Sequence, residues 1–269
     1  MLADAPRLFN DLGSLGAAPL MLLLVASFAA GWVDAVVGGG GLIQLPMLSI
    51  LLPHAATAQI LATNKIASVF GTLASATTYI RRIGFDRSTG AWLAPTALIG
   101  AAAGAAVAAA IPRSAFDPII VVALTVVGAY TVMRPHVGTS DPAPRGDTGH
   151  IVTLACIGIA VGFYDGALGP GTGSFFVIAL VSFAGQSFLG ASAHAKIANV
   201  ATNIAALVVF VPQGAVMWSL GLAMAAANTA GGYVGARTAV ARGSGFVRVV
   251  FLVVIAVLSV TLVMKIIHG

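Results

Sequence analysis

Residues 31–41 read GWVDAVVGGGG, and residues 162–173 read GFYDGALGPGTG. The leading glycine, the aspartate and the glycine cluster recur at a constant offset of 131 positions, which aligns Asp34 with Asp165. Such glycine clusters continue a helix poorly, because glycine costs about 1 kcal/mol and proline about 3 kcal/mol in a helix interior. We therefore expect a helix to break at the same place in each half of the chain.

The same offset extends along most of the sequence. It aligns Lys65, Ile66, Ala67, Gly100 and Gly104 with Lys196, Ile197, Ala198, Gly231 and Gly235. The chain is therefore predicted to be an internal duplication, with a first transmembrane repeat at 1–133 and a second at 150–269. Residues 134–149 between them hold Pro, Gly, Ser and charged side chains, which predicts a cytoplasmic linker.

The composition predicts an all-α polytopic membrane protein. Hydrophobic residues make up 59% of the chain, charged residues only 8%, and the mean hydropathy is +1.01, whereas globular domains carry roughly 25% charged residues. Apolar runs near the ~20 residues that span a bilayer occur at 17–37, 57–80, 90–111, 115–133, 150–168, 188–211, 214–236 and 247–264. Two more runs, 42–52 and 174–184, are too short to cross alone and are predicted to be half-helices or re-entrant pieces sheltered by protein.

The arginines predict that the two repeats have inverted topology. Arg81, Arg82 and Arg87 surround the loop after the lysine-containing segment of the first repeat, while the equivalent loop, 211–213, is uncharged. In the second repeat the next loop instead collects Arg237, Arg242 and Arg248. Because Lys and Arg mark cytoplasmic loops, equivalent loops are expected on opposite sides of the membrane. If the short segments do not cross, the repeats would be parallel instead.

The two lysines are the strongest candidates for a binding site. A lysine near the bilayer centre costs about 2.5–3.5 kcal/mol, so it is usually retained to face a polar cavity, a counter-ion or a substrate. Polar residues follow each lysine at helical spacings of three and four, so each half carries a polar stripe on one helix face. The predicted substrate-binding residues are Lys65, Lys196, Asn64, Ser68, Thr72, Asn199 and Asn203, together with the backbone at Gly39, Gly40, Gly171 and Thr172. The alternative is that the lysines form structural ion pairs or reach the membrane interface.

Asp34 and Asp165 each lie four residues before a glycine cluster, inside an apolar run. A buried carboxylate is expensive and tends either to pair with a cation or to bind a proton. The two aspartates are therefore candidates for ion-pair partners of the lysines or for proton-coupling groups, and the sequence leaves both roles open.

Several other functions find little support in the sequence. No basic run indicates a nucleic-acid partner, no Walker loop indicates ATP, and a single cysteine with five histidines predicts neither a metal site nor a cofactor. A membrane-embedded enzyme would have to use His194, Lys196 and Asp165 without a positioned nucleophile. His194 precedes Lys196 by two residues, so it points away from the lysine stripe and is expected to be a packed or interfacial residue.

With these motifs, including Thr63-Asn64-Lys65 and Lys196-Ile197-Ala198-Asn199, essentially the whole chain resembles the TauE/SafE family of sulfite exporters and related organosulfur-anion permeases. The resemblance implies transport of sulfite, sulfonates or related small anions across the bacterial inner membrane, often as an exit route in sulfonate breakdown. The second repeat has Ala195 where the first has Asn64, so the two lysine motifs differ at that position.

These observations together predict a multi-pass secondary transporter of the bacterial inner membrane, expected to export a small sulfur-containing anion such as sulfite or a sulfoacetate-like sulfonate. Its site is predicted near the membrane midplane, between the two repeats. The expected partners are the anion and the lipid bilayer, and the sequence leaves open whether protons are coupled to transport or the membrane potential alone drives it. An anion channel is the main alternative, since the same pocket would serve it, and a membrane-embedded enzyme is the other.

Overall fold

The computed structural model describes residues 16–84, 86–108 and 148–268. These residues are helical, and no strand occurs among them, which confirms the predicted all-α membrane fold. The predicted segment 115–133 and most of the predicted linker 134–149 lie outside the described residues. Thr148 and Gly149, the last two residues of that linker, already belong to a helix.

The helices follow the predicted apolar runs closely. In chain order they are α2 (Ala17–Val37), α3 (Gly41–Leu51), α4 (Thr57–Ile83), α5 (Arg87–Val107), α7 (Thr148–Ala167), α8 (Thr172–Phe183), α9 (Phe188–Phe210) and α10 (Trp218–His268). The predicted runs 214–236 and 247–264 both fall in α10, which is interrupted at Gly243 by a left-handed φ of 74°. The predicted short segments are α3 and α8, with 11 and 12 residues.

Within the described residues, four helices, α2, α5, α7 and α9, are long and apolar enough to cross a membrane. α4 has 27 residues but carries the polar stripe of the first repeat along its buried face. α3 and α8 are only about 16 and 18 Å long at 1.5 Å per residue, about half of a ~30 Å hydrocarbon core. The chain is therefore a multi-pass membrane protein with two half-length helices inside the bundle.

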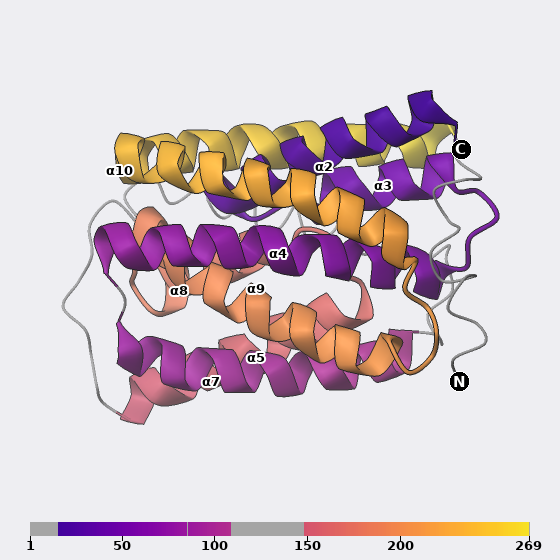
Figure 1. The fold of residues 1–269 in the computed structure, drawn as a ribbon. Helices are drawn as coiled ribbons and strands as arrows, with labels where there is room; N and C mark the ends of the chain where they lie inside the picture. Colours follow the sequence, from indigo (N-terminus) through magenta and orange to yellow (C-terminus); the bar gives the residue numbers. More distant parts are fainter. Residues whose placement is uncertain (1–15, 85, 109–147, 269) are drawn as a thin grey trace.

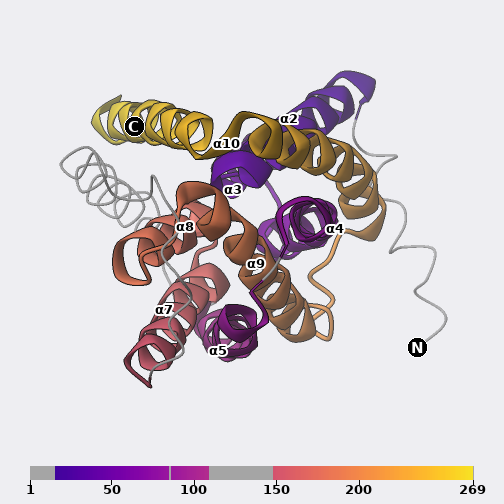
Figure 2. The same ribbon diagram turned by 90° about the vertical axis from the view of Figure 1, so that its left-hand side faces the viewer.

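The long helices form three layers in which the two repeats interlock. α4 and α9 pack against each other in the middle of the bundle, with α2 and α10 on one side and α5 and α7 on the other (Figure 2). Each outer layer thus contains one helix from each repeat. The repeats therefore contact each other within every layer. Further contacts between the repeats, from α4 to α10 and from α5 to α9, join the central layer to the two outer layers.

Glycines let the outer helices approach backbone to backbone. A Cβ added to Gly100 on α5 would lie 2.4 Å from the carbonyl oxygen of Ile159 on α7, and one added to Gly231 on α10 would lie 2.0 Å from that of Phe28 on α2. Phe28 and Ile159 are themselves related by the 131-residue offset. The duplicated glycines therefore make the same close helix contact twice, as small residues do at membrane helix interfaces.

The helix connections are consistent with the predicted inverted repeats. In Figure 1 the connection from α4 to α5 lies at the left end of the bundle, and the equivalent connection from α9 to α10 lies at the right end. Equivalent helices of the two repeats therefore run in opposite directions.

Candidate functional site

Both predicted helix breaks are present, and they touch each other. α2 ends at Gly38, whose φ of 75° is left-handed, and the equivalent Gly169 after α7 has a φ of 86°. A Cβ added to Gly38 would lie 2.2 Å from the backbone of Gly173, and one added to Gly173 would lie 2.4 Å from that of Gly38. Only glycine fits this contact, so the clusters bring together two backbones that are far apart in sequence.

A half-helix starts directly after each break. α3 begins at Gly41 after the N-cap residue Gly40, and α8 begins at Thr172 after the N-cap residue Gly171. A glycine N-cap has no side-chain oxygen to accept a hydrogen bond from the first-turn N–H groups, and the helix dipole adds partial positive charge at this end. Two positive helix ends therefore lie beside the point where the breaks meet.

A small polar pocket of about 30 Å³ lies at this junction. It is lined by Asp34, Gly39, Gly40, Gly41, Asn64, Lys65, Ser68, Thr72, Asp165, Gly169, Gly171, Thr172, Gly173, Asn199 and Asn203. The structure thus brings together every residue predicted to bind substrate except Lys196, together with both predicted aspartates. Lys196 does not line the pocket; its ammonium group contacts the carboxylate of Asp34, which does.

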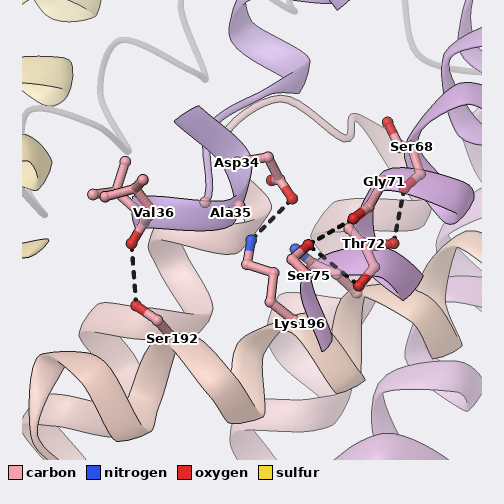
Figure 3. A network of polar contacts seen from close by, with 12 residues as sticks. Asp34, Ala35, Val36, Ser68, Gly71, Thr72, Ser75, Ser192 and Lys196 are labelled. Carbon is pink, nitrogen blue, oxygen red and sulfur yellow. Dashed lines mark hydrogen bonds and ion pairs between the residues drawn. The ribbon is translucent and has the colours of Figure 1, made fainter. Parts of the chain in front are cut away.

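The lysines and aspartates pair across the repeats. Lys65 Nζ of the first repeat lies 2.7 Å from Asp165 Oδ2 of the second, and Lys196 Nζ of the second lies 2.9 Å from Asp34 Oδ2 of the first; Figure 3 shows the second pair. The sequence left the choice of partner open. Each pair therefore ties α4 or α9 in the central layer to the broken helix of the opposite repeat.

These pairs are deeply buried, but not equally. The side chains of Lys65 and Asp165 are 3% and 6% exposed, whereas that of Lys196 is fully buried and that of Asp34 is 18% exposed. An unpaired buried charge is costly, and removing one partner of a buried pair destabilises a protein by about 3–5 kcal/mol. The formal charges of the two lysines and two aspartates sum to zero, so these side chains balance one another.

Some amides and hydroxyls of the pocket have hydrogen-bond partners among the described residues, and others do not. Thr72 donates its hydroxyl proton to the carbonyl oxygen of Ser68 in its own helix, at 2.8 Å (Figure 3). Asn64 and Asn199 are only 4% and 5% exposed, and the side-chain oxygen of each has no hydrogen-bond partner among the described residues. Each of these buried oxygens can accept a hydrogen bond from a water or from a donor group of a ligand in the pocket.

Side chains that the sequence did not single out hold the first break in place. Tyr79 donates to Ala35 O at 2.9 Å, Ser192 donates to Val36 O at 3.3 Å (Figure 3), and Ser174 donates to the oxygens of Val37 and Gly38. These bonds satisfy carbonyls that the end of α2 leaves open. In the other repeat the equivalent positions are Phe210, Leu61 and Ile43, so the two breaks are not supported alike.

A second polar cluster consists of Ser27 on α2, Gln44 on α3 and Asn228 on α10. Gln44 Nε2 donates to Ser27 Oγ at 3.0 Å, and Asn228 Nδ2 donates to Gln44 Oε1 at 3.3 Å. All three side chains are buried, and they join α3 to α2 and α10. Their counterparts at the 131-residue offset are Gly158, Phe175 and Ala97, so comparing the halves position by position would have revealed this asymmetry.

The remaining candidates lie outside the pocket. His194 Nδ1 lies 2.9 Å from Gln186 Oε1 and 3.1 Å from Gly190 O, in keeping with the expected packed histidine. Among the residues that the structure describes, no group of three His, Cys, Asp or Glu side chains is placed to hold a metal ion.

Known proteins resemble this chain along most of its length. The sulfite exporter TauE/SafE family matches residues 23–262. The probable membrane transporter protein ORF9 of a Sinorhizobium species is 35% identical over 243 residues, covering 90% of this chain and 92% of the relative. The probable membrane transporter protein YfcA of Escherichia coli K12 is 30% identical over 254 residues, covering 94% and 93%. No solved structure matches the chain.

Proposed function

The chain belongs to the sulfite exporter TauE/SafE family of membrane transporters, and from this membership we propose that it is a secondary transporter that exports a small sulfur oxyanion. Sulfite and sulfonates such as sulfoacetate are the proposed substrates. The proposed location is the bacterial inner membrane, in line with the bacterial relatives. Substrate and direction come from the family name, whereas the chemistry of the pocket supports the anionic class.

The observation that carries the proposal is the meeting of two half-helix N-terminal ends in one buried pocket with Lys65. Helix N-termini bind anions through backbone N–H groups and the helix dipole, and transporters use half-helices in this way. Here the pocket includes the backbone of Gly39–Gly41 from one repeat and of Gly171–Gly173 from the other. An anion between them would receive donors from both repeats at once.

Side chains complete the proposed site. Lys65 and Lys196 supply positive charge, and Asn64, Ser68, Thr72, Asn199 and Asn203 supply polar contacts around the pocket. The unpartnered atoms of Asn64 and Asn199 are their side-chain oxygens, which accept hydrogen bonds. In the proposed site each amide rotates by 180° and so presents its N–H groups to the oxyanion. The small size of the cavity fits a compact oxyanion better than a large organic acid.

Transport requires no nucleotide in this proposal. Moving one negative charge outward through a potential of 100 mV releases about 2.3 kcal/mol, so the membrane potential favours export of an anion. A channel would use the same pocket, and the flux experiment below separates it from a transporter.

The test is flux from proteoliposomes loaded in turn with sulfite, sulfate, sulfoacetate and chloride, under an imposed potential. We expect saturable flux and counterflow of one sulfur anion, reduced at least about tenfold in Lys65→Ala and Lys196→Ala protein, as for loss of a charged hydrogen bond. Arg82→Ala, a change at an exposed arginine outside the pocket, is the matched control and should transport normally. Flux that does not saturate would indicate a channel, and unaltered flux in a folded lysine variant would remove that lysine from the site.

A further inference from the structure

Two lysines and two aspartates balance one another in and beside the pocket, and the inference drawn from this balance rests on the proposed function. We propose that anion and proton cross together, with Asp34 as the group that takes up the proton when the anion binds. The carboxylate of Asp34 lies 2.9 Å from the ammonium group of Lys196, and so occupies a position on that lysine that an anion needs.

A monoanion such as a sulfonate adds one negative charge to a buried pocket whose side-chain charges already balance. Asp34, Asp165, Lys65 and Lys196 balance one another, and the other lining residues are Gly, Asn, Ser and Thr. A buried site tolerates uncompensated charge poorly, and a carboxylate beside an added negative charge binds a proton more readily. Taking up one proton with each added charge restores the balance.

Asp34 is the better placed of the two carboxylates. Its side chain is 18% exposed, three times the 6% of Asp165, and it lines the pocket, whereas its partner Lys196 is fully buried behind it. A proton can therefore reach Asp34 through the pocket, while Lys196 can reach an anion only once Asp34 lets it go.

The surroundings of Asp34 contain few other groups that could take the proton. α9 contributes Lys196, α4 contributes Lys65 and Tyr79, and α7 contributes Asp165 and Tyr164. α3 and α8 carry no titratable side chain. On α10, which packs along α2, Tyr233, Arg237 and Arg242 are exposed on the outer surface, and Arg248 lies beyond the break at Gly243.

The step is a simple exchange of partners. The Asp34 carboxylate forms an O–H bond with the incoming proton and loses its ionic contact with Lys196. Lys196 keeps its three protons and turns its ammonium group to the anion. The Lys196–Asp34 pair ties α9 of one repeat to α2 of the other. The exchange breaks this tie, so the two repeats can move relative to each other only after the proton has bound.

A sulfite dianion that crosses with one proton still moves one negative charge, so the membrane potential favours its export while an acidic exterior opposes it. In proteoliposomes clamped at zero potential, an exterior one pH unit more acidic should drive sulfite accumulation of about tenfold for one proton per anion. Asp34→Asn protein should lose this accumulation, because an amide binds no proton, and the sulfite exchange that it retains should not respond to the pH gradient. Asp86→Asn, which keeps an N-cap for α5 outside the pocket, should behave as the unaltered protein.

The outcomes separate the two proposals. Absence of saturable flux in the unaltered protein would contradict the proposed function itself. Accumulation that is unchanged in Asp34→Asn would mean that the proton travels on the anion, as hydrogen sulfite, and would overturn the role of Asp34.

A measurement on the unaltered protein keeps the test decisive if Asp34→Asn does not fold. The Kd for methanesulfonate, a sulfonate that stays a monoanion and carries no proton of its own, is measured with purified protein at several pH values above neutrality. Uptake of one proton with the anion should raise the Kd about tenfold for each unit of pH. A Kd independent of pH in that range would overturn the coupling.

Discussion

Single residues decide both the geometry and the charge of the pocket. Gly38 and Gly173 lie so close that neither tolerates a side chain, and the two lysines are tolerated because each has a carboxylate within 2.9 Å. The contact between these glycines and the two lysine–aspartate pairs have different roles. The first permits the backbone approach that builds the pocket, and the second keeps charge inside it, so substitutions should affect stability and transport in different proportions.

Gly38→Ala should destabilise the protein more than Gly84→Ala. Both glycines have a left-handed φ, which costs about 1–2 kcal/mol for a residue with a Cβ. Only at Gly38 does the new Cβ meet backbone, whereas Gly84 has nothing within 4 Å. Overpacking adds about 1–3 kcal/mol. Thermal unfolding in detergent measures the difference, and equal losses for the two variants would contradict the contact.

Lys65→Met should destabilise the protein by about 3–5 kcal/mol, because Asp165 stays buried without a partner. Lys65→Met combined with Asp165→Leu should recover most of that loss, since apolar replacement of a whole buried pair is often neutral. Transport should stay absent in both. Unfolding by denaturant and flux by the same proteoliposome assay test this. A double variant no more stable than the single one would mean that the pair does not account for the loss.

At the scale of helices, the sequence predicts breaks and lengths well but predicts partners poorly. The glycine clusters and the short apolar runs correctly place the end of α2 and the half-helices α3 and α8. Hydropathy and helical spacing are local signals, however, and they do not predict which helix packs against which other helix. The crossed pairing of Lys65 with Asp165, and the cluster of Ser27, Gln44 and Asn228, therefore emerge only from the three-dimensional structure.

Gly162→Leu should prevent correct packing of α7 on α5. A Cβ at Gly162 would lie 2.3 Å from the carbonyl oxygen of Ala97, so even a small side chain forces the helices apart. Gly245→Leu adds the same side chain on α10 where nothing lies within 4 Å, and should be tolerated. The yield of monodisperse protein after detergent extraction compares the two. A well-behaved Gly162→Leu protein would show that this helix contact is dispensable.

At the scale of the molecule, inverted repeats predict that the α4–α5 and α9–α10 connections lie on opposite sides of the membrane. Ser88 at the start of α5 and Gln213 before α10 are both exposed. The connections from α4 to α5 and from α9 to α10 lie at opposite ends of the bundle (Figure 1). The arginines Arg81, Arg82 and Arg87 surround the first connection, which assigns that end to the cytoplasm.

Cysteines introduced in a Cys156→Ala background test this topology. In intact cells a membrane-impermeant maleimide should label Gln213→Cys, whereas Ser88→Cys should react only after the membrane is permeabilised. Labelling of both from the outside would mean that the repeats are parallel. The offset of 131 residues predicts the duplication, but topology follows from loop charges, which are few here, so the sequence alone leaves the parallel alternative open.

The interlocked layers bear on how such a chain arose. One repeat standing alone would carry a lysine with no carboxylate at its side, and outer helices whose glycine faces have nothing to pack on. A second copy inserted upside down would supply both. On this interpretation the fold corresponds to an antiparallel homodimer whose two halves are joined in one chain, where they can differ, as Asn64 and Ala195 do. The two halves, made as separate polypeptides cut between 134 and 147, should therefore find each other in the membrane.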